Sequence, residues 1–389
     1  MFNPFLRFKR LFVAAVFLIS ISACDDPSSI GLELVDPQSG ATEVLAVGST
    51  QVESSGLADI TGGTNTEGAY RSLFGKVNDP VAGSFFMIGY MDFLSSTNVG
   101  SAFRAAPVTF ADLELNVDYV YGDTTQPVTF NVYEVDQSWN SSNVRSDTFL
   151  VAQTLVTTAT LMPTTKTVHV ELPQSWINQN DTLLRSTSFV DDFHGFALQA
   201  TQGNAVLGIH FSGSSLRAMS VPGDTVNFSM SKVLSASSFQ DNTANTQFIT
   251  LRDGAAETLS IKFPLEPSEF GEAAIHRSII RFNSADVDAL YGPEFKRPGV
   301  IRVGLRAVAI DNATRLNVVT ADVKLDGSLS FDSETLTNIL QSENLGNSGL
   351  DRFELYFPIE SSSVDILAFK RGLPSEQGPR AIITFTSIN

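Results

Sequence analysis

Residues 112–119 (DLELNVDY) alternate between a polar and an apolar side chain at every position. Successive side chains of a β-strand point to opposite faces of the sheet, so this period of two separates the polar residues from the apolar ones. The stretch therefore predicts a strand with one face against a hydrophobic core and the other against water. Strands of this one-sided kind are typical of antiparallel sheets.

The same alternation recurs along the rest of the chain. Helical patterns are sparse: Asp332 or Ser333 is positioned to cap a helix that runs through Leu340, and shorter helical turns are expected near residues 174–178 and 285–290. We therefore expect an all-β chain built of antiparallel β-sandwich or jelly-roll-like domains. The alternating apolar residues are Val168/Val170/Leu172, Phe196/Leu198/Ala200, Leu207/Ile209/Phe211, Leu259/Ile261/Phe263/Leu265, Ile301/Val303/Leu305 and Phe353/Leu355/Phe357.

The N-terminus has the layout of a secretory signal peptide. Three basic residues at positions 7, 9 and 10 precede an apolar run over residues 11–19, and the first acidic residue is Asp25. The run has about half of the ~20 residues that a helix needs to cross a bilayer, so a permanent transmembrane segment is the weaker interpretation. We predict a cleaved lipoprotein signal peptide over residues 1–23.

Cys24 is the only cysteine of the chain. The preceding Ile21-Ser22-Ala23 resembles a bacterial lipobox, in which small residues fit the lipoprotein signal peptidase and the thiol receives a diacylglycerol. The alternative interpretation is a buried core cysteine that happens to lie near an ordinary cleavage site. We predict that Cys24 is lipidated, and with no second thiol the chain has neither an internal disulfide nor a cysteine-ligated metal.

The division of the mature chain follows from its composition. Residues 24–45 mix acids, prolines, glycine and serine, which is typical of a flexible tether behind the lipid anchor. A change in composition at residues 220–224 (SVPGD) separates two strand-rich halves. We predict one β-sandwich domain over residues 46–219 and a second over residues 220–389.

The chain is strongly acidic, with 42 Asp and Glu against 25 Lys and Arg and a net charge of −17, which falls to −20 when the three bases of residues 1–23 are removed. Nucleic-acid binding is therefore disfavoured, since a phosphate backbone requires a basic surface. Hydrophobic residues make up 43% of the chain, which suffices for a substantial core. The acidity is best interpreted as a well-solvated surface.

Four segments resemble, in the same order, the domain-of-unknown-function 4270 family of Bacteroidetes-type lipoproteins. They are residues 30–34 (IGLEL), 73–83 (LFGKVNDPVAG), 121–123 (YGD) and 132–135 (VYEV). The resemblance covers residues 24–135 and implies an envelope lipoprotein of unknown activity, with no catalytic residues to carry over. A shorter stretch, residues 130–139 (FNVYEVDQSW), is similar to disaggregatase-related and carbohydrate-binding-like sandwich domains.

The glycines and the Asp-Pro pair of the second segment have a structural interpretation. Gly75, Asp79-Pro80 and Gly83 interrupt an apolar stretch, as turn residues do, because glycine reaches positive φ and proline presets a turn. We expect a tight turn here, with a ligand-binding loop as the alternative.

Motifs that carry catalytic or metal chemistry are missing from the sequence. The histidines have no second histidine or cysteine at metal-ligand spacing, and no nucleophile elbow, Walker loop or dinucleotide fingerprint occurs. We predict a non-enzyme with no catalytic residues, no metal and no cofactor. The alternative is a structural calcium ion bound by loop acids such as Asp241 or Asp311. The histidines are His169, His194, His210 and His276.

Trp139 and Trp176 are the candidates for stacking on a sugar ring. The alternative is that each indole fills the end of a sandwich core, with its N–H bonded locally. Two function classes follow: a non-catalytic surface-binding or accessory module of the envelope with a glycan or protein partner, and a glycan hydrolase on a β-sandwich scaffold. The hydrolase would use a carboxylate pair such as Asp191-Asp192 or Glu134 with Asp136.

Asp25 and Asp26 lie directly behind the lipid anchor. In Bacteroidetes-type bacteria, which the family resemblance implies, acidic residues at this place act as a surface-export signal, whereas in enterobacteria an aspartate at the first position favours the inner membrane. We therefore expect a protein that is anchored to the outer membrane by its lipid and exposed at the cell surface, with the periplasmic face as the alternative.

Overall fold

The computed structural model describes residues 42–48, 51–55, 60–64, 70–94, 99–139, 154–221, 223–240, 247–253, 258–264, 273–300, 302–346, 349–358, 363–364, 366–370 and 378–387. It is mostly strand, with 59% strand and 12% helix, and its sheets are antiparallel, which confirms the all-β prediction. Cys24, Asp25, Asp26 and Asp241 lie outside the described residues. In the part of the chain that is described, no helix is long and apolar enough to span a membrane.

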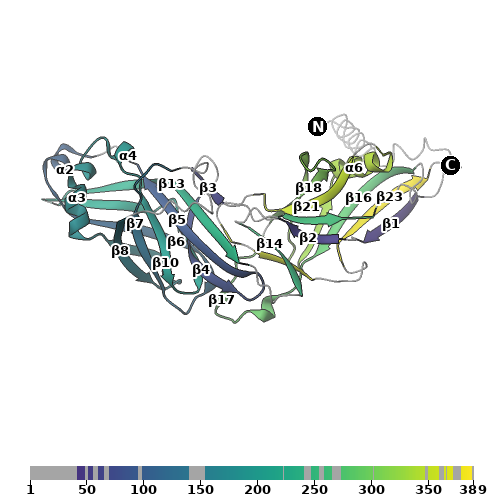
Figure 1. Cartoon of the computed structure of the whole chain (residues 1–389), viewed down its shortest axis with the longest axis horizontal. Coiled ribbons are helices and arrows are strands. Elements are labelled where there is room, and N and C mark those ends of the chain that lie inside the picture. Colours follow the sequence, from purple (N-terminus) through teal and green to yellow (C-terminus); the bar gives the residue numbers. More distant parts are fainter. Residues whose placement is uncertain are drawn as a thin grey trace, which may run out of the picture.

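The molecule is elongated and consists of two lobes along its long axis (Figure 1). We call the lobe around β6 the first lobe and the lobe around β18 the second. The first lobe contains β3 (Ile60–Thr64), β4 (Arg71–Asp79), β5 (Gly83–Phe93), α2 (Ser101–Ala105), β6 (Val108–Asp123), β7 (Val128–Glu134), β8 (Thr154–Leu161), β9 (Thr167–Glu171), α3 (Gln174–Leu184), α4 (Phe189–Asp192), β10 (Phe196–Gln202), β11 (Ala205–His210), β12 (Ser215–Ser220) and β13 (Thr225–Gln240), and β17 (Phe295–Lys296) pairs with its edge.

The strands of the first lobe form one twelve-stranded sheet that folds back on itself. Its main order is β3-β13-β12-β6-β11-β4-β5-β10-β7-β8, and an additional pairing of β13 with β5 closes part of this order into a ring. The closure is possible because β6 and β13 are each 16 residues long and pair with different neighbours along their length. The ring encloses a large core of aromatic and aliphatic side chains.

The alternation in residues 112–119 does form the expected strand within β6. Leu113, Leu115 and Val117 are buried in the core of the first lobe, at 0%, 0% and 4% exposure. Asp112, on the opposite face, is also buried, at 1%, because Arg217 donates to its carboxylate from the neighbouring strand β12 at 2.8 Å. A charged residue is tolerated there because it is paired.

The second lobe is a sandwich of two sheets over a separate core. One sheet has the order β1-β23-β16-β20 and the other β19-β18-β21-β15-β2, while β14 and β22 form a two-stranded ribbon. Its elements are β1 (Thr42–Gly48), β2 (Gln51–Ser55), β14 (Phe248–Arg252), β15 (Thr258–Lys262), β16 (Ala273–Asn283), the 3-10 helix η2 (Asp288–Leu290), β18 (Arg302–Ala309), β19 (Arg315–Asp322), β20 (Ser328–Asp332), α6 (Glu334–Asn344), β21 (Leu350–Tyr356), β22 (Ile366–Lys370) and β23 (Arg380–Ser387).

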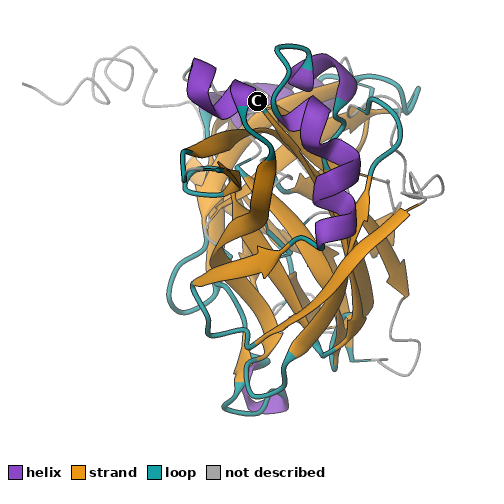
Figure 2. Ribbon diagram, turned by 90° about the vertical axis from the view of Figure 1, so that its left-hand side faces the viewer, coloured by secondary structure: helices purple, strands orange, loops and turns teal. Residues whose placement is uncertain are grey.

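The few helices lie along one edge of the molecule, and the short η2 lies at the opposite edge (Figure 2). The helix expected behind residues 332–333 is α6, and its first turn is capped by the hydroxyl of Ser333, which accepts the backbone N–H of Leu336 at 3.1 Å. Leu336 and Leu340 bury the inner face of this helix against the second core.

The predicted domain boundaries do not match the strand pairing. β13, at residues 225–240, belongs to the first lobe because it pairs with β12 and β5. β1 and β2, within residues 42–55, belong to the second lobe because they pair with β23 and β15. The composition change at residues 220–224 is the turn between β12 and β13, where Gly223 has a φ of 118°. The first lobe is therefore inserted into the second, and the expected tether ends before Thr42 because β1 begins there.

Candidate functional site

The two tryptophans lie inside the first lobe, with exposures of 1% for Trp139 and 4% for Trp176. The indole N–H of Trp139 donates to the backbone carbonyl of His194 at 2.8 Å, and that of Trp176 donates to the Glu134 carboxylate at 2.7 Å. Neither ring has a face open to a sugar, so the prediction of glycan stacking at Trp139 and Trp176 is wrong. Each indole instead fills the core with its polar atom satisfied locally.

The histidines lie far apart and have local partners. The ring of His169 faces the Asp112 carboxylate at 3.2 Å, and that of His276 faces the hydroxyl of Thr386 at 2.8 Å. Among the residues that the structure describes, no three metal-binding side chains lie together. The histidines therefore make local polar contacts in this fold.

Asp311, one of the acids considered for calcium, closes a turn between β18 and β19. Its Oδ1 accepts the backbone N–H groups of Ala313 and Thr314, each at 2.9 Å, and its Oδ2 accepts the Thr314 hydroxyl. These hydrogen bonds hold the pKa of Asp311 below its usual value. The carboxylate thus already stiffens the loop, which was the role that we had assigned to an ion.

The Asp79-Pro80 segment forms the tight turn that the sequence predicts, and this turn lies between the two lobes. Asp79 is 3% exposed, and its Oδ1 accepts the backbone N–H groups of Val81 and Ala82 at 2.7 Å. The hydroxyl of Tyr121 also donates to this carboxylate, and so does the hydroxyl of Tyr291, at 2.9 Å from Oδ2. Asp79 therefore accepts hydrogen bonds from its own turn, from β6 and from the segment after β16.

The two tyrosines stay protonated in this arrangement. Burial beside the Asp79 carboxylate raises the pKa of Tyr121 and of Tyr291 well above the ordinary tyrosine value. Arg297 completes the group: its guanidinium lies 4.3 Å from the ring centroid of Tyr291 and donates to Asp288 at 2.9 Å. The polar chain thus runs from the buried turn to the surface of the second lobe.

Apolar packing supports this polar chain on both sides of what we call the seam, the contact of turn 79–83 with residues 284–300 and 364–368. Val364 and Ile366 belong to the same buried cluster as Tyr121, and the backbone N–H of Val364 donates to the hydroxyl of Tyr119 at 2.8 Å. Val81 packs in a further cluster with residues of the second lobe. The seam therefore joins the lobes through two buried apolar clusters.

A pocket of about 550 Å³ opens beside the seam, in the second lobe. Four segments line it: residues 284–288, 297–300, 323–327 and 366–368. Its volume lies within the range of roughly 300–1,000 Å³ that is usual for small-molecule sites. The pocket is therefore large enough for one sugar unit or a short peptide segment.

The charged groups of the pocket differ in how far they are already satisfied. Asp288 is paired with Arg297, and Ser328 donates to Asp326, which lowers the pKa of that carboxyl. The Nε of Arg297 is buried and has no hydrogen-bond partner in the described structure. The charge of Lys324 also contributes to the lowered pKa of Asp326. The pocket is therefore lined by two cationic side chains, Arg297 and Lys324, and by acids that already have partners.

No protein-family model and no curated protein matches the chain. Among solved structures, the "Cryo-EM structure of T=1 Penaeus vannamei nodavirus" aligns at 10% identity over 89% of this chain and 100% of that one, with a TM-score of 0.12. A score this low carries no argument about fold or function.

The residues that shape the pocket were not singled out from the sequence. Arg297 and Lys324 lie in segments without periodicity or a known motif, and the other lining residues come from the segment after β16, the turn between β19 and β20, and β22. The one usable signal was Lys296-Arg297, a pair of adjacent bases in a chain with few of them, followed by Pro298-Gly299. Only the fold reveals that Arg297 lines a cavity.

Proposed function

We propose that the protein is an outer-membrane lipoprotein that acts as a non-catalytic binding or accessory module of the cell envelope, with the pocket beside the seam as its ligand site. The size and the polar lining of this pocket carry the proposal. Lys324 lines the pocket, and its ammonium group can donate hydrogen bonds to a ligand oxygen. The ligand therefore has an acceptor oxygen, as glycans and peptides do.

The anchoring part of the proposal rests on the N-terminal sequence. The basic, apolar and small-residue order before Cys24 supports lipidation, and Asp25-Asp26 with the resemblance of residues 24–135 supports display at the cell surface. β1 begins at Thr42 and pairs with β23, so the anchor is joined to the second lobe, which also contains the pocket.

The pocket can be blocked without disturbing the fold. A Cβ added at Gly299, which lines the pocket, would meet no atom within 4 Å, and the same holds for Gly292, which does not line it. Gly299→Phe is therefore the blocking variant and Gly292→Phe its matched control. Both replace a glycine whose φ is accessible to other residues.

Arrays of defined oligosaccharides and of synthetic peptides, probed with the labelled mature protein, test the proposal. We expect at least one class of array ligand to bind the wild type and the Gly292→Phe variant and to lose binding in Gly299→Phe. Equal binding by the two variants would place the ligand elsewhere, and a wild type that binds neither array would overturn the pocket assignment. Catalytic turnover of a bound oligosaccharide would contradict the non-catalytic part of the proposal.

A further inference from the structure

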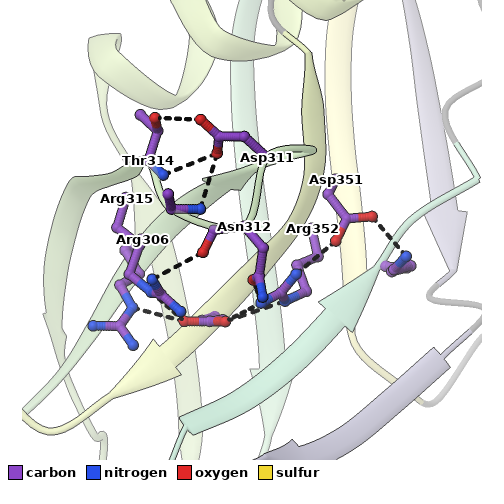
Figure 3. A network of polar contacts seen from close by, with 10 residues as sticks. Arg306, Asp311, Asn312, Thr314, Arg315, Asp351 and Arg352 are labelled. Carbon is purple, nitrogen blue, oxygen red and sulfur yellow. Dashed lines mark hydrogen bonds and ion pairs between the residues drawn. The ribbon is translucent and has the colours of Figure 1, made fainter.

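Three arginines gather around one carboxylate on a face of the five-stranded sheet (Figure 3). Arg306 of β18 donates through Nε to Glu354 of β21 at 2.8 Å, and Arg352 donates to the other carboxylate oxygen at 2.8 Å. Arg315 of β19 lies with its Nε 3.7 Å from the same oxygen that Arg306 binds. Glu354 itself is 1% exposed, because the three side chains cover it.

The face that carries this group is turned away from the core of the second lobe. Phe353 and Leu355, the neighbours of Glu354 along β21, are buried in that core, so the side chain between them points to the opposite side of the sheet. Arg306 lies directly opposite Glu354 in the register of β18 with β21. Strand pairing alone therefore brings this ion pair together.

The group holds more positive charge than its acids balance. Three guanidinium groups surround one carboxylate, which leaves an excess of two positive charges. Asp351 adjoins the group and pairs with Arg352 at 2.6 Å and with Lys262 at 2.7 Å, and Asp311 lies in the same network (Figure 3). With these residues included, four cations face three carboxylates, and the excess is one positive charge. In a chain with a net charge of −17, such a local excess of positive charge is unusual and favours the binding of an anion.

Arg306 and Arg315 keep donors free. Arg306 uses Nε on Glu354, and Arg315 uses one terminal nitrogen on the carbonyl of Asn312, at 3.1 Å. Both terminal nitrogens of Arg306 and the second one of Arg315 have no hydrogen-bond acceptor among the described residues. The two side chains are 22% and 40% exposed, so a ligand can reach these groups.

We propose that Arg306 and Arg315 bind an oxyanion, a phosphate or carboxylate group of a ligand, at the outer face of this sheet. Their Nε atoms face one oxygen of Glu354, so the two guanidinium groups lie side by side and one oxyanion can accept hydrogen bonds from both. Glu354 is the positioning residue that holds the pair in place. This site shares no residue with the pocket beside the seam and does not depend on the proposed function of that pocket.

Isothermal titration calorimetry of the full mature chain tests the site with three probes: inorganic phosphate, oligogalacturonate and uncharged maltooligosaccharide. We expect phosphate or oligogalacturonate to bind and the neutral sugar not to bind. Phosphate binding would identify a phosphate group as the ligand chemistry, and binding of oligogalacturonate alone would identify the carboxylates of an acidic glycan. Binding of neither anion, or equal binding of the neutral sugar, would overturn the proposal.

The variant Arg315→Gln separates the site from general electrostatics. It removes one guanidinium and leaves Glu354 paired with Arg306 and Arg352, so the fold should persist, which a thermal unfolding curve verifies. Arg302→Gln is the matched control, because Arg302 is also on β18, is exposed and pairs with Asp322. We expect about a tenfold loss of anion affinity in Arg315→Gln and no loss in Arg302→Gln. Equal loss in both variants would show that only overall charge is sensed.

Discussion

Replacement of Asp79 by Ala should destabilise the protein and uncouple its two lobes. The substitution removes a buried acceptor of four groups: the N–H groups of Val81 and Ala82 and the hydroxyls of Tyr121 and Tyr291. A hydrogen bond to a charged group contributes about 1.5–3 kcal/mol, and such contributions within one network do not add fully. We therefore expect a loss of about 3–5 kcal/mol, the magnitude that is typical when one partner of a buried charged network is removed.

Urea unfolding followed by two probes measures both effects. Both tryptophans of the chain, Trp139 and Trp176, lie in the core of the first lobe, so their fluorescence reports on that lobe, whereas far-ultraviolet circular dichroism reports on the strands of both lobes. In the wild type the two transitions should coincide, because the buried apolar clusters of the seam join the two lobes. In Asp79→Ala they should separate and shift to lower urea concentration.

A matched variant separates the loss of the Asp79 carboxylate from the loss of one of its hydrogen bonds. Tyr291→Phe keeps the ring over which Arg297 lies and removes a single hydroxyl donor to Asp79, so it should cost only about 1 kcal/mol. If Asp79→Ala stays within about 0.5 kcal/mol of the wild type, as ordinary surface substitutions do, the turn does not link the lobes. Coincident transitions in a strongly destabilised Asp79→Ala would likewise refute the uncoupling.

Three further predictions concern pH, anchoring and sorting. Because the folded-state pKa of Tyr121 and Tyr291 is raised, their contribution to stability is complete below the unfolded value of about 10 and is lost as the pH rises above it. Urea midpoints measured between pH 8 and 11 should therefore fall at the alkaline end, and a flat profile would contradict the burial of these hydroxyls. Cys24→Ala should release the protein from membranes or leave the precursor unprocessed, and an unlipidated Cys24 in the mature wild type, found by mass spectrometry, would exclude the anchor. Changing Asp25 and Asp26 to Ala should protect the mature protein from protease added to intact cells, while lipidation persists. Unchanged digestion of this variant would show that both acids are only linker residues.

Local features of this fold follow from sequence because they depend on neighbours only a few positions apart. The alternation around Leu113 forms a strand, Ser333 caps a helix, and Asp79-Pro80 forms a turn, as each pattern predicts.

Gly75 is an instructive exception, since it lies inside β4 instead of in a turn. Its φ is 138°, and a Cβ there would lie 2.3 Å from the carbonyl oxygen of Ala205 on the paired strand β11. Close approach of that strand, which the local sequence does not encode, requires the glycine.

Burial of particular side chains could not be predicted in the same way. The amphipathic ring of tryptophan can form an exposed surface for stacking or can pack inside a core. Trp139 and Trp176 lie in the core because the backbone carbonyl of His194 and the carboxylate of Glu134 accept their indole N–H groups there. Asp112 was expected on a solvated face, yet Arg217, 105 residues later, covers it. Such pairings depend on the register between neighbouring strands, and the sequence of one strand does not specify that register.

The sequence alone determined the period of two, the caps and turns, the acidic charge and the N-terminal motif. Each of these features depends on composition or on residues that are close together in the chain. The lobe boundaries, the seam, the pocket and the arginine group were decided only by the tertiary structure. Tyr291 meets Asp79 from 212 residues away, and Glu354 meets Arg306 from 48. Contacts over such separations depend on which strands pair, and strand pairing is chosen by the packing of the whole core, because many partners satisfy the same local alternation equally well.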